Sequence, residues 1–343
     1  MPRLSAVDAV SPAFENTTRL LFKPFRFKYW LRVGLLGILT GELGGSGFNF
    51  NLPSNTNWHP QRHFAGPVTA VPDFAKYALL IVAGVALFML LGLVFALLHG
   101  VYRFVLFETV LGHDVSLVAG WKRWFDKGMR YFGWMLLLQF VFLIAIAVFA
   151  GGPVLGVLAA GGFSHGVTTG AVLAIVWAVF ACFALMILFL LVFVFSKDFV
   201  VPMMALEDLS FTDAWRRLWA ETKGQKGSFA AYVGMKIVLS IAGGIFFGIV
   251  AIILMLIFAI PVAIVVFLLI GATHSGSIVW SVQAIVMAAA AGLVVLLGYI
   301  YSAAVAGSPI TIFFPSYGLY FLAGRYPPLE RIMFPAPPGP MMA

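Results

Sequence analysis

The chain has 343 residues, of which 62% are apolar and 10% are charged, whereas about 25% of the residues in an ordinary soluble domain are charged. A chain with this small a charged fraction cannot cover a surface that faces water. We therefore expect most of the protein surface to face lipid. The net charge of +8 comes from basic residues beside apolar runs, with no groove-reading motif near them, and we therefore expect no nucleic-acid partner. The single cysteine, Cys182, excludes a disulfide within the chain. The N-terminus lacks a clean apolar core with a cleavage site, so we predict no removable signal peptide.

Six apolar runs are candidates for membrane spans, because about 20 helical residues cross the roughly 30 Å of hydrocarbon. The first run is short and spans only if its helix continues through Gly41 to Gly45. We predict an all-α membrane protein, a bundle of about six transmembrane helices. The runs are residues 29–40, 74–98, 131–157, 167–195, 229–256 and 278–305.

Residues 229–271 form an apolar stretch that, as one straight helix, would overshoot the bilayer about twofold. We expect Pro261 to break it. The remainder either folds back near the outer face or makes a second complete span after a tight turn, which gives seven crossings. Lys and Arg near span ends accumulate on the cytoplasmic side, and the loops 151–166 and 271–277 carry neither. Six spans in the inner (plasma) membrane, with both termini cytoplasmic, fit this charge distribution better.

An internal repeat supports an even number of spans. The segment SLVAGWKRWF at 116–125 recurs as SFTDAWRRLW at 210–219, and each copy is followed by two apolar runs. A unit with two spans preserves orientation, so the repeat is parallel. We predict a single membrane domain over 1–343, divided into 1–110 with spans 1 and 2 and an outer loop 41–73, repeat units 111–205 and 206–324, and a Pro-rich cytoplasmic tail 325–343.

The repeated segment has the pattern of an amphipathic helix, with an apolar Trp-bearing face opposite a basic face. In the second copy, Ser210 and Asp213 are placed as an N-cap and a weak capping box. We expect both copies to be interfacial helices on the cytoplasmic side that bind anionic headgroups. The predicted lipid or partner contacts are Trp121, Lys122, Arg123, Trp124, Trp215, Arg216, Arg217 and Trp219.

The N-terminal segment is interpreted as a degenerate third copy. Its apolar face, opposite a polar face of Asp8, Glu15, Asn16 and Arg19, consists of Val7, Val10, Phe14, Leu21 and Phe22. The whole chain would then consist of three units, each with one interfacial helix and two spans.

Three segments carry a resemblance to a known group of proteins. They are AF-x2-T-x2-LLFKPF-x3-YWLRVGLLG at 13–37, GGSGFNFN at 44–51 and PMMALEDLSFTDAWRRLW at 202–219. Together they resemble uncharacterised bacterial multi-pass proteins that are similar to the membrane domain fused to some glycerophosphoryl diester phosphodiesterases. The catalytic barrel, with its acidic metal ligands and histidines, has no counterpart here. The resemblance therefore implies a fold without an assigned activity.

Ionisable residues inside a membrane mark ion or substrate pathways, and the sequence places very few there. Glu42 and Glu108 lie at or beyond span ends, and we expect Lys236 to extend its side chain from the membrane to water. Gln139 and Gln283 are interpreted as forming hydrogen bonds between helices. We predict no catalytic and no cofactor-binding residue.

Two further patterns receive structural interpretations. His59 and His63 have a spacing that suits a metal, but Pro60 lies between them in an irregular loop, so we predict no metal site. Ser240, Gly244 and Gly248 recur every four residues, which predicts close helix packing, either within the monomer or between protomers.

The function class favoured by these patterns is non-enzymatic. We expect an integral membrane protein that interacts with lipid or acts as a scaffold for a membrane protein partner or a homo-oligomer. The alternative is a transporter or channel for a lipid or a small hydrophobic molecule, because repeats are common in transporters. A membrane enzyme is third. It would need an acid, base or metal cluster at the interface, and we expect the acidic residues that come close to one to cap and neutralise the neighbouring basic residues instead. These are Asp198, Glu207, Asp208 and Asp213.

Overall fold

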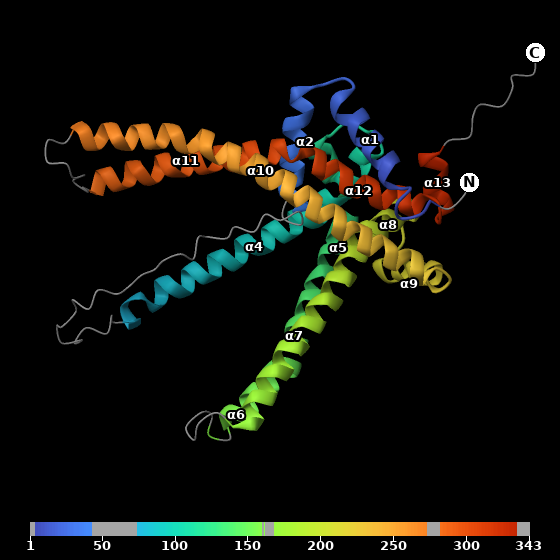
Figure 1. The fold of residues 1–343 in the computed structure, drawn as a ribbon, viewed down its shortest axis with the longest axis horizontal. Helices are drawn as coiled ribbons and strands as arrows, with labels where there is room; N and C mark the ends of the chain where they lie inside the picture. The colour runs from blue at the N-terminus through green and yellow to red at the C-terminus, as the bar shows by residue number, and fades with distance from the viewer. Residues whose placement is uncertain (1–3, 43–73, 160, 162–167, 273–281, 335–343) are drawn as a thin grey trace, which may run out of the picture.

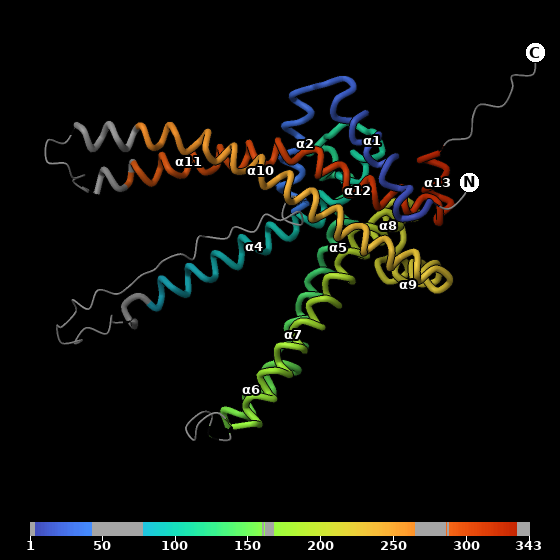
Figure 2. The backbone as a smooth tube through the Cα atoms, in the orientation of Figure 1, coloured from blue at the N-terminus to red at the C-terminus, as the bar shows by residue number. Residues whose placement is uncertain are grey.

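The described part of the chain, residues 4–42, 74–159, 161, 168–272 and 282–334 of a computed structural model, is built from helices without a strand. This confirms the predicted all-α class. Figure 1 shows three arms that radiate from a compact region, and Figure 2 follows the same path as a tube. The arms are α4 (Phe74–Val110), the pair α5 (Leu117–Ile146) and α7 (Thr169–Phe195), and the pair α10 (Lys226–Ala272) and α11 (Val282–Ala306).

Five helices in these arms are long and apolar enough to cross a membrane. In the most apolar window of each, at most 11% of the residues are buried by protein. α5 continues through the π-helix η1 (Ala147–Gly151) into α6 (Gly152–Ala159), and α7 continues through the π-helix η2 (Ser196–Val200) into α8 (Val201–Glu207). Because so much apolar surface is exposed, the arms belong in lipid, and the chain is a membrane protein.

The first predicted span is not a span in the described structure. Its residues form α2 (Phe27–Leu39), whose 13 residues reach about 20 Å at 1.5 Å per residue. The helix ends because Gly41 takes a left-handed φ of +62°. Val33 and Leu36 are fully buried against protein. α2 is therefore a packed helix at the base of the arms.

The predicted break at Pro261 is also wrong. α10 runs without interruption for 47 residues, with Pro261 inside it. Neither the folded-back segment nor the tight turn occurs at this position. Pro261 removes one backbone hydrogen bond of α10. In lipid the other backbone N–H and C=O groups find partners only within the helix, so the loss of one hydrogen bond does not end α10. Its length is accommodated because its first turns, with buried Phe229 and Tyr232, lie among the other helices at the base of the arms. The predicted loop 271–277 lies largely outside the described residues.

The two copies of the repeated segment have different structures. The first copy is the beginning of α5 and continues straight into the arm, so it is not the separate interfacial helix that was predicted. The second copy is a separate helix, α9 (Phe211–Lys223), because the glycine-containing stretch after Lys223 ends it before α10 begins. Ser210 caps α9 as predicted, its hydroxyl accepting a hydrogen bond from the Asp213 backbone N–H at 3.2 Å.

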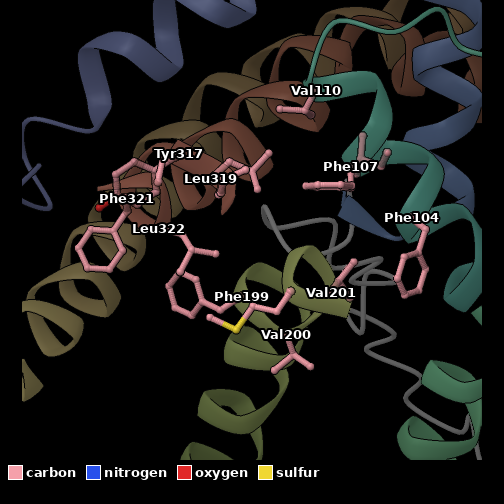
Figure 3. Packing of buried hydrophobic residues seen from close by; sticks show 14 of the residues in the cluster. Phe104, Phe107, Val110, Phe199, Val200, Val201, Tyr317, Leu319, Phe321 and Leu322 are labelled. Atoms are coloured by element: carbon pink, nitrogen blue, oxygen red, sulfur yellow. The ribbon is translucent and has the colours of Figure 1, made fainter. Parts of the chain in front are cut away.

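The base of the arms is a folded unit with its own core, which we call the hub. It comprises α1 (Val10–Phe22), α2, η2, α8, α9, α12 (Ser308–Ala323), α13 (Pro327–Met333) and the near ends of α4, α5, α10 and α11. Side chains from α4, η2 and α12 interlock there (Figure 3). Among them, Phe199 packs against Tyr232 and Phe321 with ring centroids 4.9 and 6.0 Å away. Because α1 and α13 both lie in the hub, the described chain begins and ends at the same end of the arms.

α1 buries only part of the face expected for a third interfacial helix, since Leu21 on that face is fully buried but other members are not. Phe14 is 65% exposed, whereas Asn16 is buried, donating to the Val110 carbonyl at 3.1 Å and to the Ser316 hydroxyl at 3.2 Å. The apolar pattern was misleading because the small residue Ala13 and the hydrogen-bonded Asn16 allow α1 to lie close against α12.

Close contact of α4 with α5 depends on glycine. A Cβ atom on Gly128 would lie 2.6 Å from the Val101 Cα atom, whereas a Cβ on Gly133, further along the same helix, would meet open space. Gly128 therefore sets the distance between two helices that leave the hub in different directions.

We predict that Gly128→Ala lowers the free energy of unfolding by about 1–3 kcal/mol, because the backbone of α4 must move. Gly133→Ala is the matched control and should be neutral or raise stability by up to about 1 kcal/mol through helix propensity. Thermal unfolding of both variants in the same detergent measures the difference. Equal stability of the two variants would contradict the close contact.

Candidate functional site

Five charged side chains meet where the arms join the hub. They come from four segments that are distant in sequence: the turn after α2, α4, η2 and α10. All five are buried or nearly so, with side-chain exposures from 3% to 11%. We call them the ionic cluster, and its members are Glu42, Arg103, Lys197, Asp198 and Lys236.

Glu42 binds two of the cations. One carboxylate oxygen pairs with the Arg103 guanidinium, and the other accepts a hydrogen bond from Lys197 Nζ at 2.8 Å. Arg103 also donates to the Thr40 carbonyl at 3.1 Å, which fixes the end of α2 against α4. Burial alone would raise the pKa of Glu42, but Arg103, Lys197 and Lys236 together hold it well below its usual range. Glu42 therefore stays ionised.

Asp198 binds the remaining cation. Its Oδ2 atom accepts hydrogen bonds from Lys236 Nζ and, at 2.9 Å, from the Tyr232 hydroxyl. Tyr232 is oriented by stacking on Tyr317, with ring centroids 5.0 Å apart. Gly318 leaves room for it, because a Cβ at that position would lie 3.1 Å from the Tyr232 hydroxyl oxygen. The prediction that Asp198 neutralises a nearby basic residue is confirmed, and the prediction that Lys236 reaches water is wrong.

The π-helix η2 explains how adjacent residues serve both halves of the cluster. A π-turn adds a residue to the helical turn, so the side chains on either side of it are rotated relative to an uninterrupted α-helix. Lys197 binds Glu42, and its neighbour Asp198 binds Lys236. Such bulges occur frequently at functional sites. η2 thus links the α2–α4 contact to the α10 contact.

The cluster carries unequal charge. Its three cations and two carboxylates leave one excess positive charge, and no other carboxylate in the described residues forms an ion pair with it. A cavity of about 20 Å³, with Arg103, Lys197 and Asp198 in its wall, lies beside it. That volume accommodates one water molecule. The cluster can therefore hold charge and water.

The predicted interfacial contact residues divide into two groups. Trp121, Trp124 and Trp215 are half-buried; for example, the Trp124 ring stacks on Phe104 at 5.6 Å and its Nε1 atom donates to Glu108 at 2.9 Å. Trp124 and Trp215 pack against the hub core, and the Trp121 ring lies 5.7 Å from the Tyr102 ring of α4. The exposed members of the predicted set are Lys122, Arg123, Arg216, Arg217 and Trp219, of which Trp219 is 59% exposed.

The other polar and small-residue predictions have mixed outcomes. Gln139 is exposed on α5 and makes no hydrogen bond within the described part of the chain, so the predicted interhelical bond is absent. A Cβ on Gly248 would meet open space, so Ser240, Gly244 and Gly248 do not mark a close helix contact at Gly248 in the monomer. Packing between protomers stays a prediction. His59, His63 and the side chain of Gln283 lie outside the described residues.

A comparison with protein-family models matches residues 4–332, which covers nearly the whole chain. The chain belongs to the family of unknown function DUF7544. No curated protein and no solved structure matches it. Membership in DUF7544 agrees with the expected resemblance to uncharacterised proteins, and the family supplies no activity that could be transferred to the ionic cluster.

Sequence reasoning missed the ionic cluster because each member looked like an end-of-span residue. Lys236 lies ten residues after the start of α10, where a lysine ordinarily reaches water. The available signal was the adjacent pair Lys197 and Asp198 just before the second copy of the repeated segment, together with Arg103 in the equivalent position before the first copy. Charges of both signs at the same depth can neutralise one another.

We predict that Glu42→Gln lowers the free energy of unfolding at neutral pH by about 3–5 kcal/mol, because Arg103 and Lys197 lose their counter-charge in a buried site. The pKa of Glu42 is depressed in the folded protein, so its stabilisation is present above the unfolded value of about 4.3 and is lost as pH falls below it. Thermal unfolding of the original chain and of the Glu42→Gln variant should be measured between pH 7 and pH 3. The difference between their free energies of unfolding should become smaller below about pH 4.

Glu15→Gln serves as the control for this measurement, because Glu15 is exposed on α1. Its effect should stay within about 0.5 kcal/mol at every pH. A Glu42→Gln variant that matched this control would show that the cluster does not depend on its carboxylate.

Proposed function

We propose that this DUF7544 chain is a non-enzymatic integral membrane protein of the inner membrane that binds lipid and acts as a scaffold for membrane components. The observation that carries the proposal is the contrast between the hub and the arms. The hub folds around its own core, whereas in the most apolar window of each of the five long helices at most 11% of the residues are buried by protein. Side chains exposed in this way require lipid or the helices of another membrane protein as partners.

The proposed orientation has the hub on the cytoplasmic side, with both termini there. Its support is the distribution of basic residues. Lys and Arg on α1, α2, η2 and α9 lie in the hub, whereas α6 and the first turns of α7, at the far end of one arm, carry neither. Lys76, in the first turn of α4, is a basic residue at the far end of another arm.

The repeat and the amphipathic helices belong to the same proposal. α9 buries Phe211, Ala214 and Leu218 and exposes Arg216 and Arg217, which is compatible with an interfacial helix beside anionic headgroups. We retain Arg216, Arg217 and Trp219 as the contact surface of α9, and Lys122 and Arg123 as exposed contacts on α5. The likeness to the membrane domain of glycerophosphoryl diester phosphodiesterases is part of this hypothesis, as a shared membrane-anchoring role without the catalytic barrel.

Cysteine accessibility in intact cells tests the orientation, using chains in which Cys182 has been replaced. Thr212, exposed on α9, reports on the hub, and Thr169, the first residue of α7, reports on the far end of an arm. We expect Thr169→Cys to react with an impermeant thiol reagent and Thr212→Cys to react only after permeabilisation. The reverse pattern would place the hub outside and contradict the proposal.

A transporter or channel for a lipid or small hydrophobic molecule is the second candidate. The ionic cluster favours it, because buried charges near a membrane are costly and are commonly kept for function. The two candidates differ in what they require of the charges. A scaffold needs only a packed junction, whereas charge-dependent transport needs the ions themselves.

The double variant Asp198→Asn with Lys236→Met separates the two candidates, because it removes both charges and leaves no unpaired ion. In proteoliposomes we expect no transfer of fluorescent phospholipid between leaflets above that of protein-free liposomes, for either the original or the variant chain. Transfer by the original chain that is lost in a folded variant would overturn the scaffold in favour of the transporter.

A further inference from the structure

Seven consecutive exposed residues run from the last residue of α1 to the second residue of α2 on the surface of the hub. They alternate aromatic and basic side chains around one proline, and we call them the Phe-basic strip: Phe22, Lys23, Pro24, Phe25, Arg26, Phe27 and Lys28. The three phenylalanines are 49%, 60% and 61% exposed. The rings of Phe22 and Phe25 pack against the Trp30 ring, with centroid distances of 5.2 and 5.6 Å. Exposed phenylalanine side chains next to a membrane can insert into its apolar region, and the contacts with Trp30 orient Phe22 and Phe25 before they do so.

The strip lies at the level where a membrane-crossing helix reaches the hub. α2, which begins within the strip, packs along the hub end of α11. The Tyr301 hydroxyl donates to the Leu31 carbonyl at 3.4 Å, and the Ser308 hydroxyl donates to the Trp30 carbonyl at 3.2 Å. Tyr301 is within the last two turns of α11. The strip is therefore beside the membrane boundary whichever side the hub occupies.

A pocket of about 310 Å³ opens between the strip and the turn that follows α4. Its polar lining residues are Arg19, Lys23, Arg26, Tyr29, His113 and Asp114. Within the described chain, neither Lys23 nor Arg26 forms an ion pair, and Arg19 donates to the Asn16 side chain at 2.7 Å. The pocket thus presents three cations to one carboxylate.

Tyr29 adds a hydrogen-bond donor to this wall. Burial, together with the nearby Asp114 carboxylate, raises its pKa to about 12. The phenol therefore keeps its proton at neutral pH. Cations combined with a neutral donor suit phosphate oxygens, which accept several hydrogen bonds at once.

We propose that this pocket binds the phosphate group of an anionic glycerophospholipid, while Phe22, Phe25 and Phe27 enter its acyl region. Asp114 supplies an acceptor for a headgroup hydroxyl, as in a phosphatidylglycerol. A soluble phosphate compound would use the cations but would leave the three phenylalanines in water. The proposal rests on the proposed function only in requiring that the arms cross a lipid bilayer, and it concerns residues distinct from the α9 contact surface.

The test is titration of the detergent-purified full-length protein with phosphatidylglycerol or phosphatidylcholine, read by native mass spectrometry. We expect the original chain to retain phosphatidylglycerol in preference to phosphatidylcholine. Lys23→Ala with Arg26→Ala should weaken phosphatidylglycerol binding at least about ten-fold, because two charge-assisted contacts are lost. Lys226→Ala with Arg331→Ala is the matched control, since it removes one lysine and one arginine from exposed positions outside both the pocket and α9, and should bind like the original chain.

Three outcomes would overturn the proposal. The first is equal phosphatidylglycerol binding by the pocket variant and the original chain, and the second is equal weakening in the control variant, which would indicate unspecific charge attraction. The third is displacement of the lipid by an equal concentration of glycerol phosphate, which would assign the pocket to a soluble phosphate. The lipid titration could contradict binding at the pocket while Thr169→Cys and Thr212→Cys are labelled as expected. In that case lipid binding at the pocket would be ruled out, and the proposed orientation would still hold.

Discussion

The junction between the arms and the hub depends on charges that have been removed from water. A buried ion costs several kcal/mol unless a counter-ion and further hydrogen bonds compensate it. Glu42 and Asp198 supply this compensation for cations on α4, η2 and α10. Each pair joins segments that are distant in sequence, so the cations are compensated only when these segments meet in the observed arrangement. The ionic cluster thus determines which helices meet at the hub, in addition to any stability that it contributes.

The hub and the arms are stabilised by different physical effects. In the hub, aromatic rings from η2, α10 and α12 stack around Phe199 and Tyr232, and this burial is the ordinary hydrophobic effect. Along the arms, lipid is as apolar as the side chains, so hydrophobic burial does not drive one helix against another. The arms can therefore diverge without leaving apolar surface in water. The hub keeps their common origin fixed.

The functional proposals follow from the distribution of charge. The ionic cluster is enclosed and nearly balanced, which suits a structural junction or a site for water and ions. The pocket beside the Phe-basic strip is open, positively charged and next to the hub end of α11. The two sites lie at opposite ends of α2, since Glu42 follows its last turn and the strip contains its first residues. A ligand in the pocket would thus contact the same helix that the cluster anchors.

The amino-acid sequence by itself determined that the chain is helical and membrane-embedded. Hydropathy and helix length are local properties, and a span such as α7 has no arrangement other than a helix that satisfies its backbone in lipid. The Ser210 cap could also be predicted, because its partner Asp213 is three residues away. The tertiary structure decided which residues were in lipid and which were in a protein core. α2 is apolar enough for either, and the amphipathic α1 suits either a membrane interface or a protein core. Their burial depends on surfaces contributed by α11 and α12. The same limit applies to Lys236 and the Phe-basic strip, because whether a charge or a phenylalanine meets protein, lipid or water depends on residues far away in the chain.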